Sequence, residues 1–246
     1  MNLRRRLVFA IVLVGVSITF YLLQNLLFHS LQETEFYFFQ DLAFLPLQVL
    51  LVSLILESIM KEREKRERLA EINILVGAFF SEMGSEAIER MKYSITNMDG
   101  IIKELQVNGT YGPREFRQAA NDAARYEFKA DSRKADLGEL GTFLHEKKDI
   151  ILAMFENPNL LENNRFTSML WAVYHVMDEI KNREDLLALP PSDLDHLSGD
   201  LQRAYRHLVV EWIFYMEHLK EKYPYLFSLA VRKSPFLEKR SVIVYS

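Results

Sequence analysis

Two long apolar runs near the amino terminus constrain this 246-residue chain more than any other feature. Residues 7–28 carry no formal charge. As a helix they would span about 33 Å, enough to cross the hydrocarbon core of a bilayer. Residues 42–60 form a second run that is nearly as apolar. We therefore predict two transmembrane helices, joined by a short external loop over residues 29–41, that make residues 1–60 a membrane anchor.

A cleaved signal peptide is the alternative for the first run. The basic start, Arg4-Arg5-Arg6, suits such a peptide, but the apolar stretch is longer than a signal-peptide core of about 7–15 residues. The exit from the run, Phe28-His29-Ser30-Leu31, also lacks the small-x-small cleavage pattern. These observations favour an uncleaved anchor.

The basic residues predict the orientation of the two spans. Three Arg precede the first run and five Lys or Arg lie in residues 61–68, whereas residues 29–41 contain none. By the positive-inside rule, both termini are expected in the cytoplasm, with the chain spanning the plasma membrane twice. The external loop is too short for a folded ligand-binding domain. A stimulus would therefore arrive through lipid, through a partner or from the cytoplasm.

Polar residues inside the spans are candidate functional positions. Gln24, Gln48 and Ser53 can hydrogen-bond between helices, and Glu57 is ionisable within an apolar run. Glu57 also lies one turn from the cytoplasmic edge, where it can pair with Lys61 at i+4. Both a functional and a purely structural role remain open for these residues.

A charged stalk helix is predicted over residues 61–83, and apolar residues recur along it with heptad spacing. These candidates for self-association are Leu69, Ile72, Val76, Phe79 and Met83. A second seam follows over residues 88–105, displaced by five residues across Gly84-Ser85, which predicts a helix stop and a new N-cap. Either seam can pack within one chain or against a second chain.

The rest of the chain is predicted to form an all-α bundle of about six helices over residues 84–232, followed by a tail over 233–246. Asp136 is expected to cap a helix reaching about Glu156, Asn164 to cap the next, and Ser192 to cap a long helix ending before Pro224. We find no alternating βα pattern, no fixed-period repeat and no linker that divides this part.

Several chemistries are excluded by what the sequence lacks. The chain has no Cys, which removes thiol catalysis, disulfides and thiolate metal sites. No glycine-rich phosphate-binding motif or nucleophile elbow occurs. With a formal net charge of −4 and no basic aromatic tract, nucleic acid is not an expected partner.

Histidine–acid pairs are the only pattern that points to metal chemistry. Five of the six His residues have an acid four positions later, where about one such pair is expected from the acid content. The pairs are His29/Glu33, His145/Asp149, His175/Glu179, His196/Asp200 and His207/Glu211. Each pair would share one helix face, and facing pairs can hold a di-iron centre in a helical bundle.

The helical wheels argue against such a centre. His145 and His175 fall away from the apolar face of their helices and are expected to point to water. Only His207, Glu211 and His218 border apolar positions, as a stripe on the last long helix. A metal site needs ligands that converge from several helices, so these three are weak candidates. We predict no metal and no cofactor.

The last long helix carries aromatic side chains on two sides. Tyr205, Trp212 and Tyr215 fill one face, while Phe214 lies on the other. Such a helix is either central in its domain or lies at an interface. Burial in the core is the default expectation for these aromatics, and the alternative is a docking surface, for which Trp212, Phe214 and Tyr215 are the candidates.

Together these features favour a membrane-anchored cytoplasmic helical module that is not an enzyme. It would have a signalling, regulatory or scaffolding role, self-associating through its spans and stalk and binding an unidentified cytoplasmic protein. The alternative is a subunit of an oligomeric channel or transporter, with Gln24, Gln48 and Ser53 facing a lumen. A membrane-bound di-iron enzyme is a third hypothesis.

Overall fold

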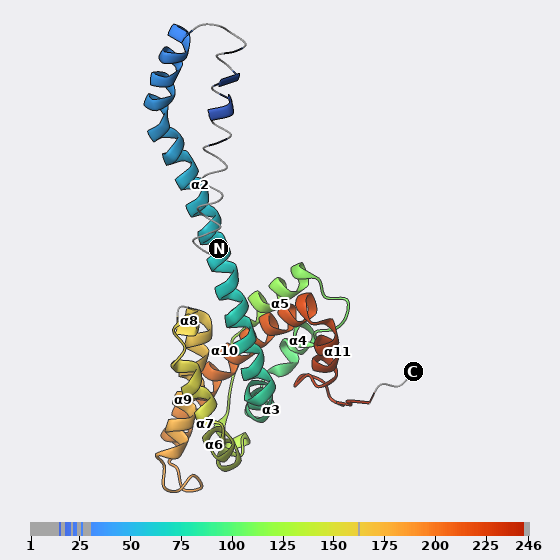
Figure 1. The fold of residues 1–246 in the computed structure, drawn as a ribbon. Helices are drawn as coiled ribbons and strands as arrows, with labels where there is room; N and C mark the ends of the chain where they lie inside the picture. Colours follow the sequence, from blue (N-terminus) through green and yellow to red (C-terminus); the bar gives the residue numbers. More distant parts are fainter. Residues whose placement is uncertain are drawn as a thin grey trace. The chain divides into compact units, whose positions relative to one another are not determined.

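The computed structural model describes residues 15, 18–20, 22–23, 26, 31–161 and 163–243. The protein is all-helical and forms two compact units, Met1–Lys65 and Arg66–Ser246 (Figure 1). Most of the predicted first span, including Gln24, lies outside the described residues. The second unit is the helical bundle that the sequence predicts.

The long helix α2 (Leu31–Phe79) includes the second predicted span. Its helical start corrects the predicted loop over residues 29–41, because from Leu31 onward no Gly or Pro interrupts the chain before Pro46, which lies inside the helix. Every described side chain from residue 42 to residue 60 is exposed. Among the described residues, one helical stretch, Phe36–Lys92, is long and apolar enough to cross a membrane.

The end of α2 continues into a π-helical turn, η1 (Phe80–Gly84), and then into α3 (Ser85–Lys92). The backbone N–H of Ser85 donates to the carbonyl of Phe80, five residues back. The predicted stop at Gly84-Ser85 is therefore wrong, since both residues have helical dihedral angles. The π turn absorbs the five-residue displacement of the apolar pattern, so that Met83 and Ile88 both reach the core.

Gly84 is required in the π turn by the rings beside it. A Cβ at this position would lie 2.6 Å from Cε1 of Phe79 and 2.7 Å from Cδ1 of Phe80. Both rings are buried, with 0% and 1% exposure. The rings have little room to move, so a larger residue is expected to strain this turn.

The second predicted seam, over residues 88–105, is not one helix. The chain leaves α3 after Lys92 and forms an antiparallel bridge between Ile95 and Ala130. The side chain of Asn97 donates to the carbonyl of Glu127 at 2.8 Å and accepts from the backbone N–H of Lys129 at 2.9 Å. Such side-chain to backbone bonds compete with helix formation, which explains the break.

Short and long helices complete the second unit. They are η2 (Met98–Gly100), α4 (Ile102–Leu105), α5 (Pro113–Arg125), η3 (Ser132–Lys134), α6 (Leu137–Glu146), α7 (Lys148–Phe155), α8 (Pro158–Leu161), α9 (Asn164–Lys181), α10 (Pro191–Lys222) and α11 (Pro224–Arg232). The Asp136 cap is confirmed, since its Oδ1 accepts from the backbone N–H of Glu139 at 2.8 Å. The other two caps are displaced: Asn163 caps α9, and α10 begins at Pro191 without a side-chain cap.

The helix α10 is the centre of the second unit and packs against α9, α5, α11 and α3 (Figure 1). Tyr205 is fully buried, with its ring 5.2 Å from that of Phe128. Trp212 meets Phe236 of the tail at 5.0 Å. Burial on several sides of α10 agrees with its apolar residues on two faces.

Candidate functional site

The predicted polar positions of the second span lie exposed on α2. Gln48, Ser53 and Glu57 are all exposed. Glu57 Oε1 pairs with Lys61 Nζ at 2.7 Å, the i+4 contact expected at the edge of the span. These three residues therefore lie on the surface of α2.

The candidates for self-association in the stalk lie mostly in the core of the second unit. Ile72, Val76, Phe79 and Met83 are buried, and Leu69 alone is exposed, at 48%. The ring of Phe79 lies 5.5 Å from that of Phe166 on α9. Because these side chains already pack within their own chain, the intrachain alternative holds for four of the five candidates.

The docking candidates on α10 also pack largely within their own chain. Trp212 and Tyr215 are buried, with 1% and 8% exposure, and Tyr215 stacks on Phe80 at 5.0 Å. Phe214 is partly buried under the guanidinium of Arg165, 3.7 Å from its ring centroid. Core packing, the default expectation for these aromatics, is what the structure shows for Trp212 and Tyr215.

A groove of about 680 Å³ does open over the edge of these aromatic rings. Its lining includes Phe80, Trp212 and Tyr215, with apolar side chains of α11 on one side. Charged residues of both signs also line it: Glu82, Glu86, Glu89, Glu139, Arg90, Lys233 and Arg240. An apolar floor with a charged rim is the usual composition of a protein-binding surface.

A group of His and acidic side chains gathers where α9 and α10 meet. We call it the histidine–carboxylate cluster; it consists of His175, Glu179, His196 and Asp200. Nε2 of His175 and Nε2 of His196 lie 3.4 and 3.3 Å from Oδ2 of Asp200. The same two nitrogens each lie 3.7 Å from an oxygen of Glu179.

The cluster brings together two of the His–acid pairs, which lie on two different helices. His175 was expected to point to water, but it reaches across to Asp200 on α10. Its side chain is 43% exposed, and that of Asp200 is 3% exposed. The i+4 spacing indicated two of the four contacts, while the meeting of the two pairs depends on how α9 and α10 pack.

Two arginines hold the carboxylates of the cluster. Arg203 donates to Oδ1 of Asp200 at 3.1 Å, and Arg183 donates to Oε2 of Glu179 at 2.7 Å. The bond from Arg183 is the main reason that the pKa of Glu179 is lowered. Asp193 also binds Arg183 with both oxygens, each at 2.6 Å. Arg183 therefore keeps Glu179 in its ionised form, and the two arginines fix the orientation of both carboxylates.

The three weak metal candidates on α10 do not form such a group. Glu211, whose side chain is 3% exposed, pairs with Arg165. Burial raises the pKa of Glu211 and lowers the pKa values of His207 and His218. Among the described residues, the histidine–carboxylate cluster is the only group of three or more His and acidic side chains with the spacing of metal ligands.

Comparison with known proteins places the chain in a family. Residues 68–232 match the family model "Uncharacterized protein MJ1433, C-terminal helical domain", and residues 2–60 match "MJ1433, N-terminal helical domain". The chain belongs to the MJ1433 family. It is 39% identical over 242 residues to the uncharacterized protein MJ1433 of Methanocaldococcus jannaschii, covering 98% of this chain and 96% of that relative. No solved structure matches.

The two MJ1433-family domains divide the chain close to its own structural boundary. The family models leave a gap between residues 60 and 68, and the two compact units separate between Lys65 and Arg66. Four of the five basic residues of 61–68 lie in this gap, and the fifth, Arg68, is the first residue of the C-terminal match. The charged segment therefore marks the junction between the apolar and the folded part.

Proposed function

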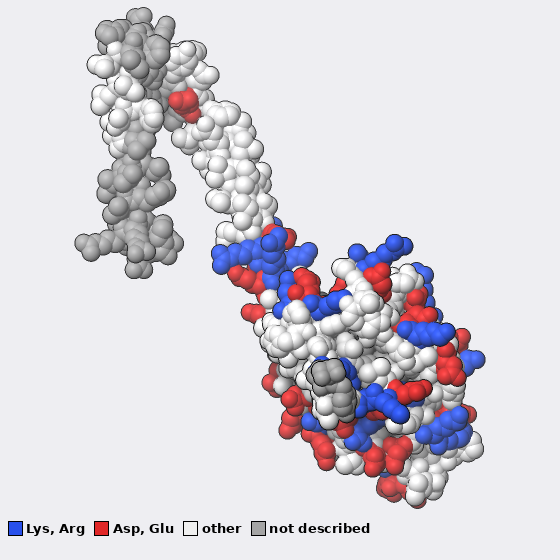
Figure 2. All heavy atoms as spheres, turned by 90° about the vertical axis from the view of Figure 1, so that its right-hand side faces the viewer, with Lys and Arg blue, Asp and Glu red and all other residues white. Residues whose placement is uncertain are grey.

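We propose that this MJ1433-family protein is a membrane-anchored cytoplasmic helical module that acts by binding rather than by catalysis. The observation that carries the proposal is the apolar surface of α2. Thirteen large apolar side chains between Leu42 and Met60 are 47–69% exposed. Figure 2 shows this helix as an almost unbroken white surface that ends at a dense band of charged side chains.

A surface of this kind is too apolar to remain in water. At about 1.5 kcal/mol or more for each large apolar side chain transferred from water, thirteen half-exposed side chains represent roughly 10–20 kcal/mol. The free energy of folding of a domain is about 5–15 kcal/mol, so the cost of exposure is of the same size. A lipid bilayer covers a continuous helical surface of this length without requiring any partner chain.

The groove beside α11 supports the binding part of the proposal. It places an aromatic floor within a rim that carries four Glu and three basic side chains. A segment of a cytoplasmic protein with an apolar anchor and charges of both signs fits this composition. The role that follows is regulatory, signalling or scaffolding, with the partner held near the membrane.

Membrane association is tested by fractionation of the full chain. Membranes carrying the untagged protein are washed with alkaline carbonate and sedimented. We expect the protein to stay in the pellet, as an integral protein does. Recovery in the supernatant would contradict the anchor, since it would mean that the apolar surface is covered by protein rather than by lipid.

Self-association is a separate part of the proposal. It would occur through the predicted spans, because four of the five stalk candidates are buried in the core of their own chain. It is tested by the mass of the full chain in nanodiscs, measured by light scattering with the lipid subtracted. A dimer supports the module proposed here. A monomer removes self-association, and four or more copies favour the channel or transporter alternative.

A further inference from the structure

We propose that the histidine–carboxylate cluster binds one divalent transition-metal ion between α9 and α10. The inference is independent of the membrane anchor, because all four side chains belong to the second unit. The cluster combines two imidazoles with two carboxylates, one of each from each helix. Ligands thus converge from two helices, the condition that a single stripe on α10 does not meet.

The spacing of the four ligand atoms fits a tetrahedral site. With metal–ligand bonds of about 2.0–2.1 Å, neighbouring ligand atoms of a tetrahedron lie roughly 3.3–3.4 Å apart. The distances from Asp200 Oδ2 to the two His Nε2 atoms are 3.3 and 3.4 Å. Nε2 of His175 lies 3.7 Å from Oε1 of Glu179, and Nε2 of His196 lies 3.7 Å from Oε2 of Glu179. All four residues offer ligand atoms that lie within 4.8 Å of one another. For all four atoms to take tetrahedral positions, the longest separation would shorten by up to about 1.4 Å, so Glu179 would move toward the ion.

The buried oxygen of Asp200 points to a missing partner. Within the described part of the chain, Oδ2 of Asp200 accepts no hydrogen bond although it is buried. The two His nitrogens that face it stand at distances longer than usual N–H···O bonds of about 2.7–3.2 Å. A buried carboxylate oxygen without a partner is costly. A cation placed between Oδ2 and the two nitrogens would satisfy all three atoms at once.

The arginines around the cluster hold the carboxylates as supporting groups do in metal sites. Arg203 binds Oδ1 of Asp200, which leaves Oδ2 free to face the histidines. Arg183 fixes Glu179 and is itself neutralised by Asp193. Hydrogen bonds of this kind orient ligating carboxylates and raise metal affinity. Three carboxylates against two guanidinium groups also leave a net negative charge, which favours a dication.

The donor set selects the class of ion. Ca²⁺ and Mg²⁺ prefer sites made of oxygen ligands alone. Two imidazole nitrogens with two carboxylate oxygens suit Zn²⁺, Fe²⁺, Co²⁺ and Mn²⁺ better. The spacing of the ligand atoms favours a tetrahedral ion, of which Zn²⁺ is the usual representative.

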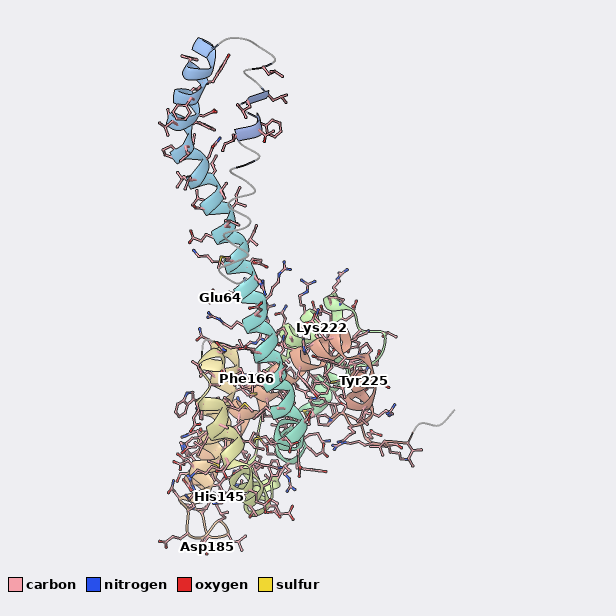
Figure 3. All side chains as sticks on the ribbon, in the orientation of Figure 1. Glu64, His145, Phe166, Asp185, Lys222 and Tyr225 are labelled. Atoms are coloured by element: carbon pink, nitrogen blue, oxygen red, sulfur yellow. The ribbon has the colours of Figure 1, made fainter. Side chains whose placement is uncertain are left out.

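A bound ion would join the end of α9 to the start of α10. The connection between these helices runs over residues 182–190 and includes Asp185, labelled in Figure 3. The side chains of His175 and His196 are 43% and 54% exposed, so an ion can enter from solvent. The ion would fix the relative position of two helices that form a large part of the second unit's core.

The test uses the full chain without a polyhistidine tag, purified in detergent and stripped of metal with a chelator. Co²⁺ is titrated into the protein, and the visible absorption that distinguishes tetrahedral from octahedral Co²⁺ is recorded. We expect one Co²⁺ per chain with a tetrahedral spectrum, displaced by one equivalent of Zn²⁺. His196→Ala and Asp200→Asn are each expected to weaken binding by about tenfold or more.

His145→Ala is the matched control. His145 (Figure 3) also has an acid four residues later, Asp149, but both are exposed and neither belongs to the cluster. The affinity of the His145→Ala variant for Co²⁺ is expected to equal that of the wild type. Circular dichroism in the presence of chelator confirms that each variant is folded, and Asp200→Asn keeps the shape of the side chain if His196→Ala does not fold.

Two results would overturn the site. The first is the absence of a stoichiometric tetrahedral Co²⁺ complex in the wild type, which would leave the cluster as a set of side-chain contacts that holds no ion. The second is an equal loss of affinity in the His145 control and the cluster variants, which would mean that ions bind scattered surface groups.

Discussion

The pair formed by Arg165 and Glu211 makes the sharpest stability prediction. The Glu211 side chain is 3% exposed and is held by Arg165, which also covers the ring of Phe214. Arg165→Met keeps an unbranched apolar chain over the ring but removes the positive charge that opposes the effect of burial on the pKa of Glu211. The variant must therefore bury an unpaired carboxylate or take up a proton.

The free energy of protonating Glu211 sets the upper limit of the stability that the variant loses. At pH 7, protonating a carboxyl group with an ordinary pKa costs about 3.7 kcal/mol. Breaking a buried ion pair costs about 3–5 kcal/mol, and the half-exposed Arg165 shows that water reaches one side of this pair. We expect Arg165→Met to lower the free energy of unfolding by about 2–3 kcal/mol at pH 7.

The sign of the pH dependence follows from the raised pKa of Glu211. Because burial raises this pKa above its unfolded value, the folded state binds the proton more readily, and stability falls as pH rises between the two values. Removing Arg165 raises the folded pKa further. The loss in the variant is therefore largest at pH 7 and shrinks to about 1 kcal/mol at pH 5, where protonation costs little.

The assay is urea unfolding of the full chain in detergent, followed by tryptophan fluorescence at pH 7 and pH 5. The double variant Arg165→Met with Glu211→Gln is expected to recover most of the loss at pH 7, since the buried group is then neutral. Arg117→Met, on the exposed face of α5, is the control and should change stability by less than about 0.5 kcal/mol. An equal loss at both pH values would refute the reasoning.

Three further predictions, made with five variants, test the packing of the second unit by the same unfolding assay. Gly84→Ala should destabilise the protein by about 1–2 kcal/mol, because the added Cβ would lie 2.6 Å from a buried ring. Gly77→Ala is its matched control: the nearest atom to the added Cβ lies 3.9 Å away, so this variant should stabilise the protein by about 0.5–1 kcal/mol. Phe79→Ala should cost about 3–5 kcal/mol, while Leu69→Ala, at an exposed position, should cost less than about 1 kcal/mol. Asp136→Ala should cost about 1 kcal/mol through loss of the α6 cap. Equal effects within either matched pair, or an unchanged Asp136 variant, would contradict these assignments.

Patterns within one helix were readable from the sequence. The apolar run over residues 42–60 and the two-sided aromatic pattern of α10 depend only on local periodicity, and the structure has helices at both places. The cap at Asp136 was readable for the same reason, because capping needs only neighbouring residues. These features follow from the spacing of side chains along a single helix.

Features that depend on several elements were missed. The π turn at Phe80–Gly84 places Met83 and Ile88 in the same core. A helical wheel assumes a regular α-helix and therefore does not predict this turn. The histidine–carboxylate cluster was missed because a wheel places His175 relative to its own helix and not relative to α10. The sequence did show an excess of His residues with an acid four positions later. Which of these pairs lie close together depends on how the helices pack.

Membrane topology is the most direct test of the proposed anchor. The chain contains no Cys, so a single Cys can be placed at Gln32 or at Lys65 and labelled with a membrane-impermeant maleimide. We predict that intact cells label Gln32→Cys and that Lys65→Cys reacts only after the membrane is opened. Labelling of Lys65→Cys in intact cells, or protection of Gln32→Cys until the membrane is opened, would contradict the account.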